Sequence, residues 1–403
     1  MEKRRKKKRI KRLNFVFLFL SILLGIIIGY LLPHPLSQNK TQKSESSSVV
    51  HAKTQSPSKK TTPSSSREVA PSFPATQPAM TPQETEINNQ LKPYIGSQVG
   101  TLLIVRNGQI HFERGYGYFD VSKKIENNPN AQYQILSAQK TITAQMIMNL
   151  VENGQLSLTD KVSKFYPQLK NGDQIEIKNL LNMTSGLVKP TSLPTSTDDL
   201  TIADWTASNV TSNGKVGQWN YIDQNYVLLA GIVVKLTGTS YQKLFDQDFK
   251  AKLGLTHSGF VYNKDEVINL ATPYHFTYQE PYSAPIVESD AQRYSELGAG
   301  NIAMTPGDFY TLISSILQNK TLSAQGNVLL HSLGTVTSGY SGGMYKRINY
   351  YTLSGVGYGY ELKAKFTNDG KNAVIFMSNS FPTANDLIQQ QLVANIFKLE
   401  FGL

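Results

Sequence analysis

Residues 133–153 read YQILSAQKTITAQMIMNLVEN, a strand-like start followed by a helical repeat. The first four residues are rich in apolar and aromatic side chains, which is typical of a short strand. From Ser137 onward apolar residues recur at helical spacing, and Asn153-Gly154 supplies a stop signal. The stretch therefore predicts a strand that leads directly into a helix opened by Ser137.

Ser137 and Lys140 are three residues apart, so a helix would place both side chains on one face. The positive end of the helix dipole disfavours an ammonium, so we expect the pKa of Lys140 to lie below its usual value of about 10.4. A neutral Lys140 could accept the Ser137 proton, and Ser137 could then form an acyl-enzyme. The pair is a candidate nucleophile and base.

The S-x-x-K pattern alone is weak, because it recurs at Ser37, Ser56, Ser212 and Ser240. Residues 339–343, GYSGG, fit the G-x-S-x-G nucleophile pattern, but strand-like residues follow and all six histidines come earlier in the chain. This segment is therefore predicted to be a glycine-rich turn. Without cysteine, an H-E-x-x-H motif or a phosphate-binding glycine loop, we expect no metal and no cofactor.

Other segments complete a coarse fold. Strand-like runs flank Asn107-Gly108, which predicts a hairpin, and Thr305-Pro306 predicts a capped helix start. The C-terminal third predicts strands at 347–353, 358–367 and 373–377, a turn at 368–370 and a helix at about 385–401. Helices are also predicted at 177–183 and 226–236. The order of elements predicts an α+β fold in which helices flank one antiparallel sheet.

The net charge of +11 is distributed very unevenly. Residues 1–70 carry an excess of 12 positive charges, whereas residues 71–403 have a net charge of −1. A folded nucleic-acid-binding face needs a basic surface, so we expect no nucleic-acid partner.

The N-terminus predicts a membrane anchor. An uncharged apolar stretch, residues 15–32, is long enough to cross a bilayer and lacks a small-residue cleavage site. Basic residues precede it, which predicts a cytoplasmic segment 1–12, an anchor 13–33 and an extracellular remainder. Residues 34–84 are rich in Ser, Thr, Pro and Lys and predict a disordered linker ahead of a domain at 85–403.

Over about residues 85–400 the chain resembles the serine β-lactamase and penicillin-binding-protein superfamily, in its class C-like branch. Ser137-x-x-Lys140 resembles the first family motif, and Tyr221-Ile-Asp223 resembles the Y-x-N motif. Residues 353–355, LSG, stand where K-T-G or H-x-G is expected. Two further segments are similar to family segments, at 175–187 and 298–308.

The resemblance implies a β-lactamase-like fold with an all-helical subdomain, and it implies roles for particular residues. Ser137 would be the nucleophile, Lys140 its base partner, and Tyr221 the group that relays a proton to the leaving group. The backbone N–H groups of Ser137 and Val356 would form the oxyanion hole. Ser354 and Gly355 would belong to the substrate-binding strand.

Two departures from the family pattern concern charge. Asp223 replaces the usual Asn, and a carboxylate near Lys140 would favour the ammonium and oppose the base role. Leu353 replaces the usual cation, which helps to hold a substrate carboxylate. Together they favour a substrate with an ammonium and no terminal carboxylate, such as a D-alanyl ester.

We therefore expect an esterase that removes D-alanine from teichoic acids. Two alternatives remain open: a low-affinity penicillin-binding protein with D-Ala-D-Ala carboxypeptidase activity, and an inactive wall-binding module. The expected partner is a cell-wall polymer, either teichoic acid or a peptidoglycan stem peptide.

Overall fold

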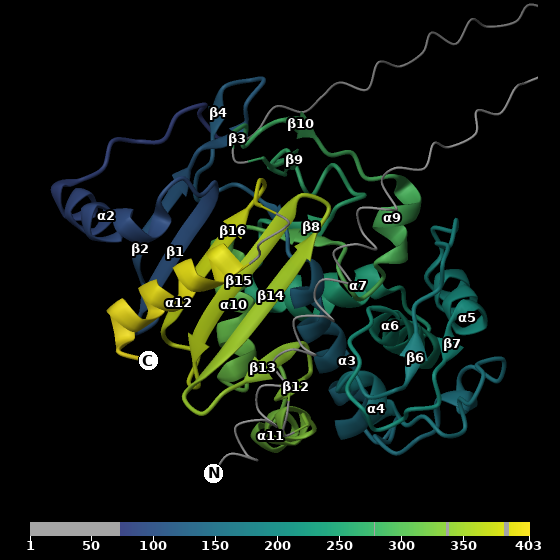
Figure 1. The fold of residues 1–403 in the computed structure, drawn as a ribbon. Coiled ribbons are helices and arrows are strands. Elements are labelled where there is room, and N and C mark those ends of the chain that lie inside the picture. The colour runs from purple at the N-terminus through teal and green to yellow at the C-terminus, as the bar shows by residue number, and fades with distance from the viewer. Residues whose placement is uncertain (1–72, 278, 336–337, 383–386) are drawn as a thin grey trace, which may run out of the picture. The chain divides into compact units, whose positions relative to one another are not determined.

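The computed structural model describes residues 73–277, 279–335, 338–382 and 387–403 (Figure 1). The predicted basic segment 1–12, the predicted anchor 13–33 and most of the predicted linker 34–84 lie outside these residues. Within the described ranges, no helix has both the length and the apolar character needed to cross a bilayer.

A seven-stranded antiparallel sheet forms the centre of the fold, in the order β12-β13-β14-β15-β16-β1-β2. The predicted hairpin at Asn107-Gly108 joins β1 to β2, and the positive φ angles of these residues, 50° and 80°, suit a tight hairpin turn. The strands are β1 (Gly100–Arg106), β2 (Gln109–Tyr116), β12 (Tyr340–Ser341), β13 (Met344–Lys346), β14 (Tyr350–Gly357), β15 (Tyr360–Thr367) and β16 (Ala373–Ser378).

Alternating residues of the central strands enter two different cores. Leu102 and Ile104 of β1 pack with the helices α2 (Pro82–Ile95) and α12 (Leu387–Phe401) on one face. Leu103 and Val105 pack with α10 (Pro306–Leu317) and the helical subdomain on the other. The predicted α+β sheet with helices on its faces is confirmed.

The helical subdomain surrounds α6 (Gln224–Thr237), and Figure 1 shows it beside the sheet. Every residue of α6 from Asn225 to Val234 is buried, and those after Asn225 are almost all apolar, so this helix forms the subdomain core. Around it lie α3 (Lys140–Glu152), η2 (Val162–Lys164), α4 (Ile177–Leu181), α5 (Asp199–Asn209), α7 (Tyr241–Phe245), the π-helical turn η3 (Asp246–Lys250) and α8 (Ala251–Leu253).

A small sheet, β5-β11-β8, connects the two parts and leads into the 3-10 turn η1 (Leu136–Gln139). Its strands are β5 (Tyr133–Gln134), β8 (Ser258–Phe260) and β11 (Ile302–Met304). The remaining elements are β3 (Tyr118–Asp120), β4 (Ile125–Glu126), β6 (Leu187–Val188), β7 (Thr211–Ser212), β9 (Tyr274–His275), β10 (Ala284–Pro285), α9 (Asp290–Ser295) and α11 (Ala324–Ser332).

Several boundaries differ by a few residues from the sequence predictions, among them the start of β14 and the start of the folded part. β14 begins at Tyr350 rather than at residue 347, because Arg347 N donates to Tyr350 O across a tight turn. Ordered contacts also begin ahead of residue 85: the Gln77 side chain exchanges two hydrogen bonds with the backbone of Gly115 on β2, both of 3.0 Å. The end of the predicted linker therefore lies against the folded part.

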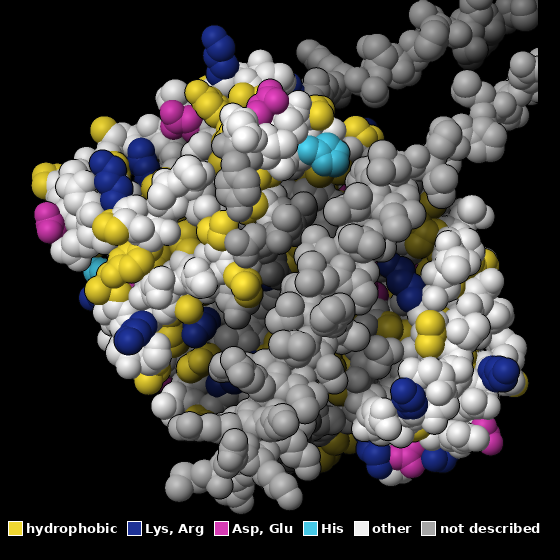
Figure 2. Space-filling view, in the orientation of Figure 1, with side chains coloured by type: hydrophobic (Ala, Val, Ile, Leu, Met, Phe, Trp, Pro, Cys, Tyr) yellow, Lys and Arg dark blue, Asp and Glu magenta, His cyan; other side chains and the backbone are white. Residues whose placement is uncertain are grey.

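Charge on the face shown in Figure 2 is dispersed. The Lys and Arg side chains are spread over the coloured part of this face, singly or in small groups, and Asp and Glu side chains are scattered over the same face. This distribution agrees with the near-neutral count for residues 71–403.

Candidate active site

Ser137 lies in η1, and α3 begins only at Lys140, so the predicted helix starts three residues later than expected. Leu136, just before Ser137, has a φ of 51°, a conformation that costs a non-glycine residue about 1–3 kcal/mol. Flanking bonds hold the turn in place: Ile135 N donates to Ile302 O at 2.9 Å, and Gln139 Oε1 accepts from Ile302 N at 2.9 Å. The small sheet thus holds the Ser137 turn at the edge of α3.

Lys140 is fully buried, and its Nζ donates three hydrogen bonds. The acceptors are Ser137 Oγ at 3.0 Å, Asp223 Oδ1 at 2.7 Å and Ala299 O at 3.0 Å. Three donated bonds match the three protons of an ammonium. The predicted Ser137–Lys140 pair is therefore present, with Asp223 in direct contact with it.

The expectation of a lowered Lys140 pKa was wrong. Burial does lower it, but the charge of Asp223, with a smaller effect from Tyr221, outweighs burial and raises the pKa above its ordinary value. A carboxylate at 2.7 Å acts on the ammonium more strongly than the dipole of a helix terminus. The competing expectation, that Asp223 favours the ammonium, is confirmed.

Asp223 and Tyr221 lie in the segment before α6, which the neighbouring turn holds in place. Asn220 N donates to Met183 O at 2.7 Å, and Asn220 Nδ2 donates to Leu187 O at 3.1 Å. These bonds come from residues 175–187, the segment that resembled a family helix-and-turn. These hydrogen bonds hold the chain in place just before Tyr221 and Asp223, and so they position both side chains in the site.

Asp223 keeps its negative charge although it is half-buried. Burial favours the neutral acid, but Lys140, with help from Lys189, holds the pKa of Asp223 below its usual value. Its side chain remains 36% exposed, so one side of the carboxylate is open while Oδ1 contacts Lys140. The carboxylate can therefore meet a second cation.

A cavity of about 270 Å³ opens over these groups. This volume is at the small end for a ligand pocket and suits a small acyl group. One wall is aromatic: the ring of Tyr221 packs edge-on against Tyr340, which packs against Tyr345. The lining residues are Ser137, Tyr221, Asp223, Tyr340, Gly343, Tyr345, Ser354 and Val356.

The part of β14 that β13 leaves unpaired borders the cavity. β13 pairs only with Tyr351 and Thr352, so β13 does not cover the following residues. Gly355 lies so close to η1 that a Cβ there would come within 2.2 Å of Ile135 O. This close approach brings Ser354 and Val356 to the cavity beside Ser137.

Leu353 does not line the cavity; it is buried in the main core. The cation nearest to Ser354 comes instead from β15, since Lys363 Nζ donates to Ser354 Oγ at 2.9 Å. Lys363 also pairs with the buried Glu361 at 3.0 Å, which compensates its charge. The sequence pattern pointed to Leu353 because the cross-strand neighbour of Ser354 could not be identified without the strand register.

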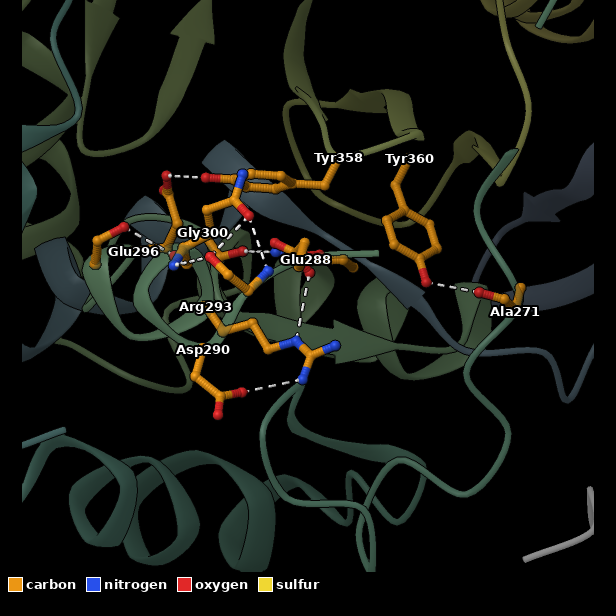
Figure 3. A network of polar contacts seen from close by, with 12 residues as sticks. Ala271, Glu288, Asp290, Arg293, Glu296, Gly300, Tyr358 and Tyr360 are labelled. Carbon is orange, nitrogen blue, oxygen red and sulfur yellow. Dashed lines mark hydrogen bonds and ion pairs between the residues drawn. The ribbon is translucent and has the colours of Figure 1, made fainter. Parts of the chain in front are cut away.

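A second carboxyl group that the sequence did not reveal lies behind Lys140. Tyr358 Oη donates to Glu296 Oε1 at 3.1 Å (Figure 3), and Ala299, which accepts from Lys140, follows in the same turn. Burial, reinforced by the charge of Asp223, raises the pKa of Glu296 to about 7. No motif marks Glu296, so only the fold brings it here.

Figure 3 also shows a neighbouring ion-pair group. Arg293 lies 3.9 Å from Glu288 and 3.4 Å from Asp290. Burial raises the pKa of Glu288 to about 7 despite Arg293. These ion pairs lie beside Glu296 (Figure 3).

The sequence profile of the Beta-lactamase family matches residues 92–396. The chain belongs to the Beta-lactamase family. It is therefore a serine hydrolase with the fold described above.

Two relatives in this family have informative names. The chain is 31% identical over 380 residues to the protein named penicillin-binding protein PbpX of Bacillus subtilis (strain 168), covering 94% of this chain and 92% of the relative. It is 33% identical over 241 residues to the teichoic acid D-alanine hydrolase of Staphylococcus aureus (strain MRSA252), covering 59% of each chain.

Solved structures agree with the Beta-lactamase assignment. FmtA from Staphylococcus aureus superimposes with a TM-score of 0.70 at 26% identity, over 83% of this chain and 92% of that one. D-amino acid amidase from Ochrobactrum anthropi superimposes with a TM-score of 0.64 at 16% identity, over 78% of this chain and 99% of that one, which shows a shared fold.

Proposed function

We propose that this Beta-lactamase family member is an envelope esterase that removes D-alanine from teichoic acids. The observation that carries the proposal is the position of Asp223. Its carboxylate is open to the cavity and lies two hydrogen bonds from Ser137 Oγ, through Lys140 Nζ. The ammonium of a D-alanyl ester is bonded to the carbon next to the reacting carbonyl, so it can meet Asp223 while Ser137 meets the ester.

The proposed reaction has two halves. Ser137 Oγ attacks the ester carbonyl carbon, and the Ser137 hydroxyl proton passes to Lys140. The carbonyl oxygen accepts hydrogen bonds from the backbone N–H groups of Ser137 and Val356. The C–O bond to the polymer breaks, the leaving alkoxide takes a proton from Tyr221, Lys140 returns its proton to Tyr221, and D-alanyl remains on Ser137. Water then releases D-alanine by the reverse proton path.

Charge selects this substrate over a D-Ala-D-Ala terminus. A peptide terminus carries a carboxylate, which Asp223 repels and for which Lys363, already paired with Glu361, is a poor anchor. A D-alanyl ester has no such carboxylate. The name of the Staphylococcus aureus relative supports this substrate class.

We also propose the location that the N-terminal sequence predicts. Residues 1–12 would remain in the cytoplasm, residues 13–33 would anchor the chain, and the folded part would work outside the cell membrane. A teichoic acid held at the same membrane would then lie within reach of the linker.

The direct test is release of D-alanine from alanylated lipoteichoic acid by the full-length chain in detergent. We expect the wild type to release free D-alanine and the Ser137→Ala variant to release none. A fluorophosphonate should label the wild type and not the variant; absence of labelling would favour an inactive wall-binding module.

A second candidate is a penicillin-binding protein with carboxypeptidase activity. The relative PbpX, matched over 94% of this chain, favours it. A stable penicilloyl adduct on Ser137, together with cleavage of a D-Ala-D-Ala pentapeptide and no D-alanine release from lipoteichoic acid, would establish this alternative. Asp223→Asn should increase penicillin acylation if Asp223 is what excludes carboxylates.

A further inference from the structure

Lys140 cannot act as a base in the state that the structure shows. An ammonium with three donated bonds has no lone pair to accept a proton, and its bond to Ser137 runs from Nζ to Oγ. Deprotonation needs a change among the three acceptors. Ser137 Oγ and Ala299 O are neutral, so Asp223 is the acceptor whose charge holds the proton on Lys140.

Asp223 is a charged acceptor that an incoming ligand can reach. Lys140 is fully buried, whereas the Asp223 side chain is 36% exposed and lines the cavity. A cation in the cavity would therefore meet Asp223 and compete with Lys140 for its charge. A neutral ligand would leave the Lys140–Asp223 pair as it is.

We propose that the substrate's own ammonium activates the site: by binding Asp223 it takes the carboxylate from Lys140, which sheds one proton and becomes the base for Ser137. This inference rests on the proposed esterase function and adds to it a reason why the amino group is needed for turnover. A chain with Asn at this position would have no such requirement.

The protons balance as follows. Before binding, Asp223 carries one negative charge and Lys140 one positive charge. After binding, the substrate ammonium takes the place of the Lys140 ammonium beside Asp223, and one proton leaves Lys140 for the solvent. Neutral Lys140 then takes the Ser137 proton as the Oγ–C bond forms, and passes a proton through Tyr221 to the departing alkoxide.

Other charged groups near the Lys140–Asp223 pair shift the equilibrium between charged and neutral Lys140, but they do not take over the role of Asp223. Glu296, behind the site, stabilises the Lys140 ammonium once it ionises near pH 7, and Lys189 favours ionised Asp223. Figure 3 shows Glu296 directed to Tyr358. The titratable groups that face Lys140 or Asp223 are Lys189, Tyr221, Tyr226, Tyr241, Glu296, Tyr345 and Tyr358.

The first test compares two esters of one alcohol, a D-alanyl ester and a D-lactyl ester, in which a hydroxyl replaces the ammonium. For the wild type, kcat/KM with the D-alanyl ester should follow a bell-shaped pH profile, which falls at high pH as the free substrate amine, with a pKa of about 8, loses its charge. With the D-lactyl ester kcat/KM should rise about tenfold per pH unit over the same pH range.

The Asp223→Asn variant should remove the preference for the D-alanyl ester. Without the carboxylate Lys140 loses its proton more readily, so kcat for the D-lactyl ester at pH 7 should increase by about tenfold or more and the advantage of the D-alanyl ester should disappear. The matched control is Asp204→Asn, which breaks an ion pair of the same 2.7 Å length between Asp204 on α5 and Lys235 on α6. This control should leave both pH profiles unchanged.

A second measurement needs no variant. Calorimetric titration with D-alaninol, in buffers of different ionisation enthalpy, should show release of about one proton per amine bound at pH 7. Propane-1,2-diol, which lacks the amine, should release none. Binding of D-alaninol without proton release, or no binding at all, would overturn the inference.

The outcomes separate this inference from the proposed function. Equal turnover of both esters with the same pH profile would reject the activation by ammonium and leave the esterase function standing. Failure to cleave either ester, with cleavage of a D-Ala-D-Ala peptide, would reject the function itself.

Discussion

Single buried groups set the electrostatics of this protein. Lys140 and Asp223 compensate each other, and removal of one partner would leave the other charge without its counterion. His331 is a contrasting case. Desolvation, reinforced by the charge of Lys346, lowers the pKa of His331 to about 4, so the ring is buried in its neutral form. Each such group makes a separate contribution to the pH dependence of stability.

His331 should make the fold less stable in acid. The unfolded chain binds a proton at His331 near pH 6.5 and the folded chain only near pH 4, so stability falls as the pH drops from about 6.5 to about 4. The full effect is about 3 kcal/mol. Urea unfolding of the wild type and of the His331→Gln variant at pH 7.5 and 4.5 measures this change in the free energy of unfolding.

The variant should lose less stability than the wild type between these two pH values. Raised carboxyl pKa values, such as that of Glu113 at about 7, act in the opposite direction and are common to both proteins. Equal losses in the two proteins would show that the ring is already protonated in the native state.

At the scale of elements, the site depends on how closely β14 approaches η1. A Cβ on Gly355 would lie 2.2 Å from Ile135 O, a backbone atom that η1 cannot move cheaply. A Cβ on Gly357 would lie 3.2 Å from the tip of the Leu136 side chain, which can move aside. An added Cβ would therefore press on a backbone atom at Gly355 but on the movable end of a side chain at Gly357.

Gly355→Ala should separate Val356 from Ser137 and lower kcat/KM for an activated ester by about a hundredfold. Gly357→Ala, the matched control, should lose far less activity. Circular dichroism and thermal unfolding show whether each variant is folded. Equal activity of both variants would mean that the strand does not contribute to the site as proposed.

Local signals explain which elements could be predicted from the sequence. The Asn107-Gly108 hairpin and the Thr305 cap, which accepts from Asp308 N, depend on residues adjacent in sequence, and both were confirmed. The start of β14 was missed because the Arg347 turn is built from strand-like residues. Glu296 could not be found, since only the long-range topology brings it near Lys140, and Lys363 was missed because its position opposite Ser354 depends on the register of β14 and β15.

At the scale of the whole molecule, the chain separates a basic N-terminal part from a near-neutral hydrolase. Residues 1–70 carry an excess of 12 positive charges and the remainder a net −1. If the proposed linker behaves as a flexible coil ahead of the described residues, residues 34–72 have a root-mean-square reach of about 34 Å. Because Gln77 is bonded to β2, the part of the linker that sets the reach ends near residue 73.

Shortening the linker should therefore affect membrane-bound and soluble substrates differently. Deletion of residues 37–66 leaves the contacts of Gln77 intact and, with nine residues left between 34 and 72, reduces the reach to about 17 Å. A soluble D-alanyl ester needs no reach, so its kcat/KM should not change. In vesicles that hold both lipoteichoic acid and the full-length enzyme, the esters lie at different distances from the membrane. A shorter linker reaches fewer of them, so D-alanine release should be slower and should stop at a lower yield. Replacement of residues 37–66 by a Gly/Ser segment of equal length is the control, and it should restore both rate and yield. If the Gly/Ser protein remained as slow as the deletion, the composition of the linker would matter rather than its length, and its lysines would be the next residues to exchange.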